Sequence, residues 1–305
     1  MTKVLVTGAS GFIGRPAVDR FVALGHDVHA LARHRPSDAD ERVRWHEVDL
    51  HDDRYVRALL SSVKPERALH LAWDVSPGFA SSPANVAWAA SSLLLLRTLS
   101  EVGCERVVMA GTCFEYDWSG GICHETNTPT RPSTLYGTAK LAVGSTAMAA
   151  SKQLNMEVAV GRVFFLFGPG EPPGKLVAHV VRSLLRGQRA ACTAGEQLRD
   201  YLYVDDVAAG LAALVDSEVT GAVNIGRGEG TRVADLVTLI GEAVGRPELV
   251  GLGDRETPDG EPPEIVADAN RLRREVGSAS PLSIEEAVRR TVAWWREDAT
   301  RGAAS

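Results

Sequence analysis

The chain has 305 residues, which corresponds to roughly two domains, or to one large domain with an added lobe. Hydrophobic residues make up 45% and charged residues 24%, as in ordinary globular proteins, so a disordered or fibrous chain is excluded. The 33 basic and 39 acidic side chains leave a net charge of −6, so the overall charge does not favour binding to nucleic acid or to an anionic membrane.

The cysteine pattern and the N-terminal residues bear on the compartment. The four cysteines are spread along the chain without a CxxC pair, which is typical of a reducing environment and gives no zinc-site spacing. Residues 1–8 run directly into an apolar strand pattern and leave no room for a signal peptide. The longest uncharged apolar stretch, residues 86–96, is too short to span a bilayer. We therefore expect a soluble cytoplasmic protein with no membrane partner and no metal site.

Short apolar runs alternate with longer segments of helical periodicity in the first half of the chain. Buried parallel strands appear as continuous apolar runs, and the helices that connect them show a 3.6-residue pattern. This alternation predicts an α/β fold with a Rossmann-type, doubly wound parallel sheet. The expected elements in chain order are strand 4–7, helix 12–24, strand 28–32, helix 54–63, strand 68–72, helix 86–102, strand 106–110, helix 134–153 and strand 157–165.

The second half of the chain is more mixed. Glycine and proline between residues 168 and 174 break the periodicity, which indicates a domain boundary nearby. We predict a dinucleotide-binding domain over residues 1–165, to which 205–226 return, and a smaller mixed α/β substrate-binding lobe over 166–305. The expected elements here are helix 175–186, strand 202–204, helix 206–216, strand 223–225, helix 234–244 and helix 284–297.

A glycine-rich turn follows the first predicted strand. Gly8, Gly11 and Gly14 form a GxxGxxG arrangement that leads directly into a predicted helix. Glycine lets the backbone approach a pyrophosphate, and the free amides and dipole at the helix N-terminus then hold that anion. A βα turn that binds nothing is the alternative. We expect a dinucleotide to bind at Gly8, Ser10, Gly11, Phe12, Ile13 and Gly14.

The end of the second predicted strand favours NADP over NAD. An acidic residue at this place binds the ribose hydroxyls of NAD, whereas an arginine accommodates the extra phosphate of NADP. No acid stands there, and Arg33 and Arg35 follow the strand at once. Either guanidinium can bind a phosphate through two charge-assisted hydrogen bonds. We expect NADP (NADPH) as cofactor, with NAD as the second choice; a solvated basic loop is the alternative interpretation of the arginines.

Three residues form a candidate reactive set. Tyr136 and Lys140 stand four residues apart at the start of a predicted helix, and therefore on one face. An adjacent ammonium and a nicotinamide cation both favour the phenolate, which moves the pKa of Tyr136 toward neutral pH. Thr112 follows a predicted strand at its carboxyl end, where open α/β sheets place their ligands. The alternative for the pair is a surface tyrosine and lysine at ordinary helical spacing.

The glycine turn, the hydroxyl residue and the Tyr136–Lys140 pair, in this order, resemble the extended short-chain dehydrogenase/reductase family. The resemblance is to its NAD(P)-dependent nucleotide-sugar epimerase, dehydratase and ketoreductase branch, and it covers nearly the whole chain. Further matching segments are Val48-Asp49-Leu50, His70-Leu71-Ala72, Gly161-Arg162-Val163, Arg199-Asp200-Tyr201 and Asn224-Ile225-Gly226.

The resemblance implies a role for each matching residue. Tyr136 would be the general acid/base, and Lys140 would orient the nicotinamide ribose and lower the Tyr136 pKa. Thr112 would hydrogen-bond the reacting oxygen. Further cofactor contacts would come from Asp49, Leu50, Leu71 and Ala72.

The substrate residues follow the family pattern less closely. Arg199 would meet the diphosphate of a sugar nucleotide, or it could equally be a structural partner of Asp205 or Asp206. Phe165 stands where UDP-sugar enzymes have an asparagine, and Lys175 stands near the place of a histidine in the bifunctional epimerase/reductases. The candidates for substrate binding are Thr112, Cys113, Phe165, Lys175, Arg199 and Arg255, of which Arg255 replaces a late arginine of the pattern and Cys113 is expected mainly to pack.

One departure from the family pattern selects among the reactions. The 4,6-dehydratases carry Asp-Glu directly after the catalytic threonine, whereas this chain has Cys113 and Phe114, so dehydration is disfavoured. We expect an NADPH-dependent ketoreductase of deoxysugar biosynthesis that acts on a nucleotide-activated 4-keto-6-deoxy sugar. The alternatives are a nucleotide-sugar 4-epimerase with tightly bound NAD and a non-catalytic, cofactor-sensing module. The family's habit would make the protein a homodimer through helices 86–102 and 134–153.

Overall fold

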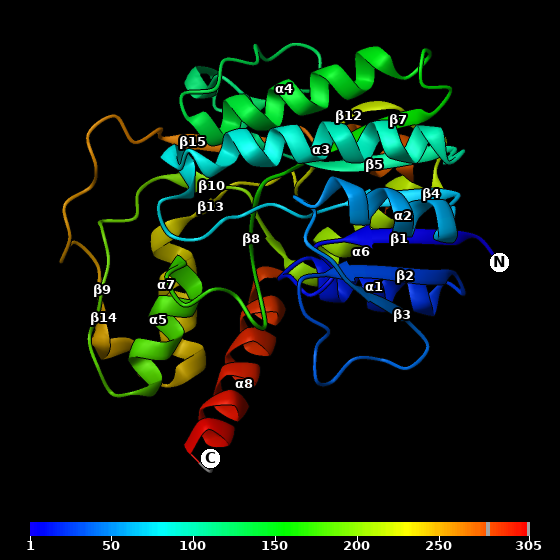
Figure 1. The fold of residues 1–305 in the computed structure, drawn as a ribbon. Coiled ribbons are helices and arrows are strands. Elements are labelled where there is room, and N and C mark those ends of the chain that lie inside the picture. The colour runs from blue at the N-terminus through cyan, green and yellow to red at the C-terminus, as the bar shows by residue number, and fades with distance from the viewer. Residues whose placement is uncertain (279–280, 304–305) are drawn as a thin grey trace.

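The structure is a computed structural model, and it describes residues 1–278 and 281–303. Its main element is a parallel sheet in the strand order β12-β7-β5-β4-β1-β2-β3 (Figure 1). The strands are β1 (Lys3–Thr7), β2 (Asp27–Ala32), β3 (Arg44–Glu47), β4 (Arg67–His70), β5 (Arg106–Thr112), β7 (Glu157–Val163) and β12 (Gly221–Ile225). The predicted doubly wound Rossmann-type sheet is thus confirmed.

Helices cover both faces of this sheet (Figure 1). The side chains of β1 alternate between the faces: Val4 and Val6 pack in one core with α1 and α6, and Leu5 packs in the other with α2, α3 and α4. Both faces are therefore buried, which explains the uninterrupted apolar runs of the central strands. The helices are α1 (Gly14–Ala23), α2 (Asp53–Val63), α3 (Ala84–Glu101), α4 (Leu135–Ala150) and α6 (Val204–Asp216).

One strand of the large sheet is not predicted by the apolar pattern. β3 has the sequence Arg-Trp-His-Glu and pairs only with β2, at the edge of the sheet. An edge strand is partly exposed and does not need a continuous apolar run. A second difference is that the expected strand over 157–165 is two strands, β7 and the short β8 (Phe165–Phe167), which pairs with β11 (Tyr201–Tyr203) instead.

A smaller lobe packs beside the carboxyl edge of the sheet. Its core is formed by the helices α5 (Leu176–Leu185), α7 (Val233–Val244) and α8 (Ile284–Ala303), with β8 and β11. A mixed four-stranded sheet adds the order β13-β10-β15-β6, in which β10 and β13 are antiparallel. The short elements are η1 (Phe79–Ser81), η2 (Cys113–Glu115), η3 (Trp118–Gly120), β6 (Ile122–Cys123), β9 (Ala190–Ala191), β10 (Leu198–Arg199), β13 (Thr231–Arg232), η4 (Pro247–Leu249), β14 (Val250–Gly251), β15 (Glu264–Ala267) and the π-helix η5 (Leu272–Val276).

The chain crosses between the sheet and the lobe more than once. After α5, α6 packs against α1 and β12 adds to β7 at the edge of the large sheet. The carboxyl ends of β1, β4 and β5 therefore face the lobe, and the loops that follow these strands form the candidate site. Within the described ranges, no helix has both the length and the apolar character needed to cross a membrane.

Candidate active site

The glycine turn is a tight cradle between β1 and α1. Gly8 has φ +67°, and a Cβ added to it would lie 2.7 Å from the backbone nitrogen of Ala72. A Cβ on Gly14 would lie only 2.0 Å from the carbonyl oxygen of Gly8. Only glycine therefore allows the backbone to turn this tightly directly before the N-terminus of α1. The structure thus brings together Gly8, Gly11, Gly14, Leu71 and Ala72, with Ser10, Phe12 and Ile13 in the same turn.

The predicted contacts for the adenosine half lie at the neighbouring strand ends. Arg33 and Arg35 are exposed after β2, and Arg35 forms an ion pair with Glu41 at 2.8 Å. Exposed ion pairs of this kind contribute only about 0–1 kcal/mol, so a phosphate can replace the carboxylate. Asp49 is exposed after β3, and its carboxylate accepts the backbone N–H of His51 at 2.9 Å; Leu50 follows it.

Thr112 is placed at the end of β5 by a buried carboxylate. The residue caps η2, and its Oγ1 accepts the backbone N–H of Phe114 at 3.3 Å. The Oε1 atom of Glu115 accepts the backbone N–H of Thr112 at 2.9 Å, and its Oε2 accepts from Nε of Arg162 at 2.7 Å. The threonine hydroxyl proton stays available to a further acceptor, as its predicted role requires.

The α4 helix begins directly against this turn. Thr134 caps the helix by accepting the backbone N–H of Gly137 at 3.0 Å. A Cβ on Gly137 would lie 2.3 Å from the carbonyl oxygen of Phe114, so only glycine allows the first turn of α4 to approach η2 this closely. This contact brings Tyr136 beside Thr112, whose side chain acts to lower the pKa of the phenol.

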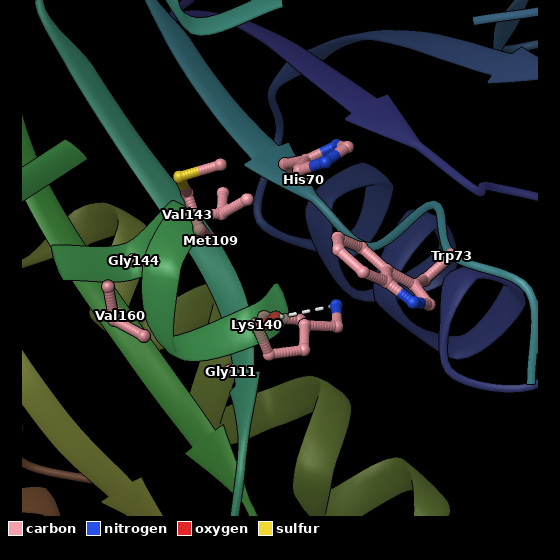
Figure 2. Close-up of a pocket in the computed structure, with 9 residues that line it drawn as sticks. His70, Trp73, Met109, Gly111, Lys140, Val143, Gly144 and Val160 are labelled. Atoms are coloured by element: carbon pink, nitrogen blue, oxygen red, sulfur yellow. Dashed lines mark hydrogen bonds between the residues drawn. The ribbon is translucent and has the colours of Figure 1, made fainter. Parts of the chain in front are cut away.

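Tyr136 and Lys140 lie on one face of α4, as predicted, and both are buried. The ammonium of Lys140 donates to the carbonyl oxygen of Ala110 at 2.9 Å (Figure 2). Burial lowers the pKa of Lys140 to about 7. Burial also raises the pKa of Tyr136, and the neighbouring Thr112 side chain opposes this effect. The expected lowering of the Tyr136 pKa by Lys140 is not found in the protein alone, because the loss of hydration dominates at this buried position.

Three aromatic side chains surround the phenol, and two of them, Trp73 and Phe79, belong to none of the sequence motifs. Phe79 meets the Tyr136 ring edge-on with centroids 4.9 Å apart, Phe114 at 5.8 Å and Trp73 at 6.3 Å. Trp73 directly follows the His70-Leu71-Ala72 segment, so its position after a strand end could have pointed to the site. Phe79 lies in a loop that carries no motif. The reacting oxygen of a substrate would therefore bind in apolar surroundings.

Two substrate candidates lie beside aromatic side chains: Lys175 lies beside Phe79, and Arg199 lies beside Phe165. The ammonium of Lys175 lies 4.7 Å from the centroid of the Phe79 ring, which places it next to the aromatic wall. The guanidinium of Arg199 is buried, lies 5.6 Å from the centroid of Phe165 and pairs with Glu261. The alternative that Arg199 pairs with Asp205 or Asp206 is wrong, since the chain folds the loop before β15 over the arginine instead.

Phe165 lies in β8 beside Arg199, and the last two substrate candidates, Cys113 and Arg255, have different surroundings. Cys113 is buried in a cluster with Tyr116, Cys123 and Phe164, in agreement with a packing role, and burial raises its pKa. Arg255 is exposed in the loop after β14, where its backbone N–H donates to the carbonyl oxygen of Cys192. The described contacts do not join Arg255 to the Tyr136 site.

A dinucleotide fits these residues. The tight glycine turn at Gly8 and Gly14 leads directly into the N-terminus of α1, where a pyrophosphate would bind, and Lys140 has an ammonium near the end of β5, where the nicotinamide ribose would bind. A bound nicotinamide would accept or supply the hydride of a redox step. Tyr136 and Thr112 would hold the reacting oxygen and move its proton.

The comparisons with known proteins identify the family of the chain. The model of the NAD dependent epimerase/dehydratase family matches residues 4–226. The dTDP-6-deoxy-L-talose 4-dehydrogenase (NAD(P)(+)) of Kitasatospora kifunensis is 27% identical, over 94% of this chain and 93% of that relative. Among solved structures, the UDP-glucose 4-epimerase of Thermotoga maritima with UDP-glucose has a TM-score of 0.88 and 24% identity, and covers 97% of this chain and 99% of its own.

A second epimerase structure was solved with its cofactor. The UDP-glucose 4-epimerase of Thermus thermophilus in complex with NAD has a TM-score of 0.84 and 25% identity, and covers 96% of this chain and 98% of its own. These relatives carry out different reactions on the same scaffold. Because the family model matches well over half of the chain, from β1 to the end of β12, the chain belongs to the NAD-dependent epimerase/dehydratase family and is an NAD(P)-dependent enzyme of the extended short-chain dehydrogenase/reductases.

Proposed function

We propose that the protein is an NADPH-dependent ketoreductase that acts on a nucleotide-activated 4-keto-6-deoxy sugar. The observation that carries this proposal is the set of neighbours of Thr112. The hydroxyl lies beside Tyr136, while Cys113 is buried in a hydrophobic cluster and Phe114 faces the Tyr136 ring. A dehydratase needs further acids at these two places, whereas reduction of a ketone needs only a hydride and one proton.

The chain's own residues have these roles in the proposed reaction. Thr112 donates a hydrogen bond to the ketone oxygen and so polarises the carbonyl group. Tyr136 gives its proton to the same oxygen as the carbon accepts the hydride, and the product is an alcohol. Lys140 orients the ribose of the cofactor. Arg199 and Lys175, at the border of the site, are the proposed contacts for the phosphates of the sugar nucleotide.

The preference for NADPH rests on the exposed arginines after β2. Arg33 and Arg35 offer two guanidinium groups at the place where NAD-binding sites carry an acid. The relative from Kitasatospora kifunensis, whose name includes both cofactors, supports a redox step on a 6-deoxy sugar. We also keep as proposals the substrate lobe over residues 166–305, the homodimer through α3 and α4, and a cytoplasmic location.

The test mixes purified protein with NADPH and a panel of dTDP-, CDP-, UDP- and GDP-linked 4-keto-6-deoxy sugars, and follows cofactor absorbance and the stereochemistry of the product. We expect NADPH oxidation with one of these sugars, and a loss of at least about 100-fold in kcat for Tyr136→Phe, since general acid catalysis contributes about 10²–10⁴-fold. Arg33→Ala should raise the KM for NADPH but not for NADH. If none of the ketosugars oxidises NADPH, the proposal fails.

A nucleotide-sugar 4-epimerase is the second candidate. It would use the same Thr112, Tyr136 and Lys140, and it is supported by the structural similarity to the Thermus thermophilus epimerase with NAD, at 25% identity. Such an enzyme keeps its oxidised cofactor and shows no net change in it. Copurified NAD⁺ together with sugar interconversion would favour this candidate. The third alternative, a non-catalytic module, does not agree with the family to which the chain belongs.

A further inference from the structure

We propose that Trp73 is a positioning residue whose indole face holds the ammonium of Lys140, and that Asn85 fixes Trp73 and Phe79 as one unit around the reactive pair. The Nζ atom of Lys140 lies 4.1 Å from the centroid of the Trp73 ring. Figure 2 shows the lysine reaching from α4 toward the indole, which follows the end of β4. At this distance a cation over a tryptophan face is stabilised, and more strongly where water is excluded.

The side chain of Lys140 has contacts on two sides and a small cavity beside it. The cavity drawn in Figure 2, which Lys140, Trp73 and His70 help to line, has a volume of only about 10 Å³. This is room for about one water molecule. One ammonium proton is directed to the carbonyl oxygen of Ala110, and the indole face covers another side of the nitrogen. The proposal assigns a further ammonium proton to a ribose hydroxyl of the cofactor.

Asn85 connects the tryptophan to the phenylalanine. Its side chain is buried at 2% exposure at the start of α3, and Oδ1 accepts the indole N–H of Trp73 at 2.8 Å. Its Nδ2 donates to the carbonyl oxygens of Phe79 at 2.7 Å and of Ser82 at 2.9 Å. One amide thus orients the indole and closes the loop that carries the Phe79 ring onto Tyr136. A buried amide with all these bonds satisfied specifies a single arrangement.

The charged and titratable groups around Lys140 come from its own α4 and from two other elements. Tyr136 lies one turn earlier on α4, His70 ends β4, and Glu115 lies in η2. Burial lowers the pKa of His70 to about 3, so this imidazole is neutral at physiological pH. The carboxylate of Glu115 favours the ammonium, and burial disfavours it. The indole face adds a second favourable interaction, which opposes the effect of burial on the ammonium.

The inference concerns cofactor binding, so it can be tested whether or not the proposed ketoreductase reaction is found. The dissociation constant of NADPH is measured by fluorescence between pH 5.5 and 9 for wild type, Trp73→Leu, Trp73→Phe, Asn85→Ala and Lys140→Met. Trp294→Leu, a half-exposed tryptophan on α8 of the lobe, is the matched control. Lys140→Met identifies which part of the pH dependence belongs to the lysine.

We expect wild-type affinity to fall as the pH rises through the pKa of Lys140, and this limb to be absent in Lys140→Met. In Trp73→Leu the limb should move down by about one pH unit, the shift that corresponds to a desolvated cation–π contact. Trp73→Phe, which keeps an aromatic face, should stay within about half a unit of wild type. Asn85→Ala should weaken NADPH binding severalfold, because it releases both aromatic side chains.

Three results would overturn the inference. The first is a limb that has the same midpoint in Trp73→Leu as in wild type, and the second is an equal shift in Trp294→Leu. The third is a pH dependence that persists in Lys140→Met. Turnover of ketosugars is measured separately with the same variants, so a failure of the proposed reaction leaves these binding results in place.

Discussion

Glu115 and Arg162 form a buried ion pair directly behind Thr112, and removing the carboxylate should destabilise the protein strongly. The Glu115 side chain is 1% exposed and the Arg162 side chain 4%. In Glu115→Ala the guanidinium stays buried without its counter-ion, and the backbone N–H of Thr112 loses its acceptor. Breaking one partner of a buried pair costs about 3–5 kcal/mol, so we expect a free energy of unfolding lower by about 4 kcal/mol.

The control for this prediction removes both charges. The double variant Glu115→Leu/Arg162→Met has no unpaired buried charge, and apolar replacements of this kind are often close to neutral. Arg162→Met removes the Nη1 donor that lies 2.8 Å from the Tyr116 hydroxyl, whereas the acceptor of that hydroxyl, Oδ1 of Asn224 at 2.7 Å, is unchanged. We expect the double variant to be at least about 2 kcal/mol more stable than Glu115→Ala.

The assay is urea unfolding followed by circular dichroism, with the slope m compared among the variants to check that the same surface is exposed. In parallel, kcat should fall in both variants, because each loses the carboxylate that fixes the backbone of Thr112. The reasoning is refuted if Glu115→Ala costs less than about 1 kcal/mol, the value of an exposed pair. It is also refuted if the double variant is as unstable as the single one.

Three further predictions concern the glycine cradle and buried ionisable groups. Gly14→Ala should abolish cofactor binding in calorimetry, because its Cβ would lie 2.0 Å from a backbone oxygen, whereas Gly174→Ala, with open space around it, should bind normally. Burial raises the pKa of Glu171 to about 8, so the folded protein binds a proton that the unfolded chain releases above pH 4.5. Glu171→Gln, which mimics the protonated form, should therefore gain roughly 3 kcal/mol relative to wild type between pH 5 and pH 8, and an unchanged difference in unfolding free energy would contradict this. Burial lowers the pKa of His29 to about 4, so wild type should lose roughly 2 kcal/mol of stability as the pH falls from 6.5 to 4, and His29→Asn should lose less in the same titration.

The sequence determined those features that depend on neighbouring residues along the chain. The central strands are apolar without interruption because both faces of the sheet are buried, and this pattern predicts a parallel sheet with helices on both sides. The turn at Gly8 and Gly14 requires backbone without side chains, so glycine itself marks the cradle. Tyr136 and Lys140 share one face of α4 by helical spacing alone.

The tertiary structure decided whatever depends on contacts between distant segments. The edge strand β3 forms because β2 offers it hydrogen bonds, and not because of an apolar pattern. Arg199 pairs with Glu261, 62 residues further along the chain, and not with the nearby Asp205 or Asp206. Ion-pair and strand partners that are distant in sequence depend on how the loops fold, and local propensity does not predict this.

The surroundings of the reactive pair also follow from tertiary packing. Local spacing predicts that Lys140 lies near Tyr136, but the directions of both pKa shifts result from burial under Trp73, Phe79 and Phe114. Trp73 and Phe79 come from the connection between β4 and α3, Phe114 comes from η2, and one buried amide, that of Asn85, holds the first two. The sequence thus determined which groups can react, and only the folded chain decided how much water and charge surround them, because hydration depends on everything that packs against a site.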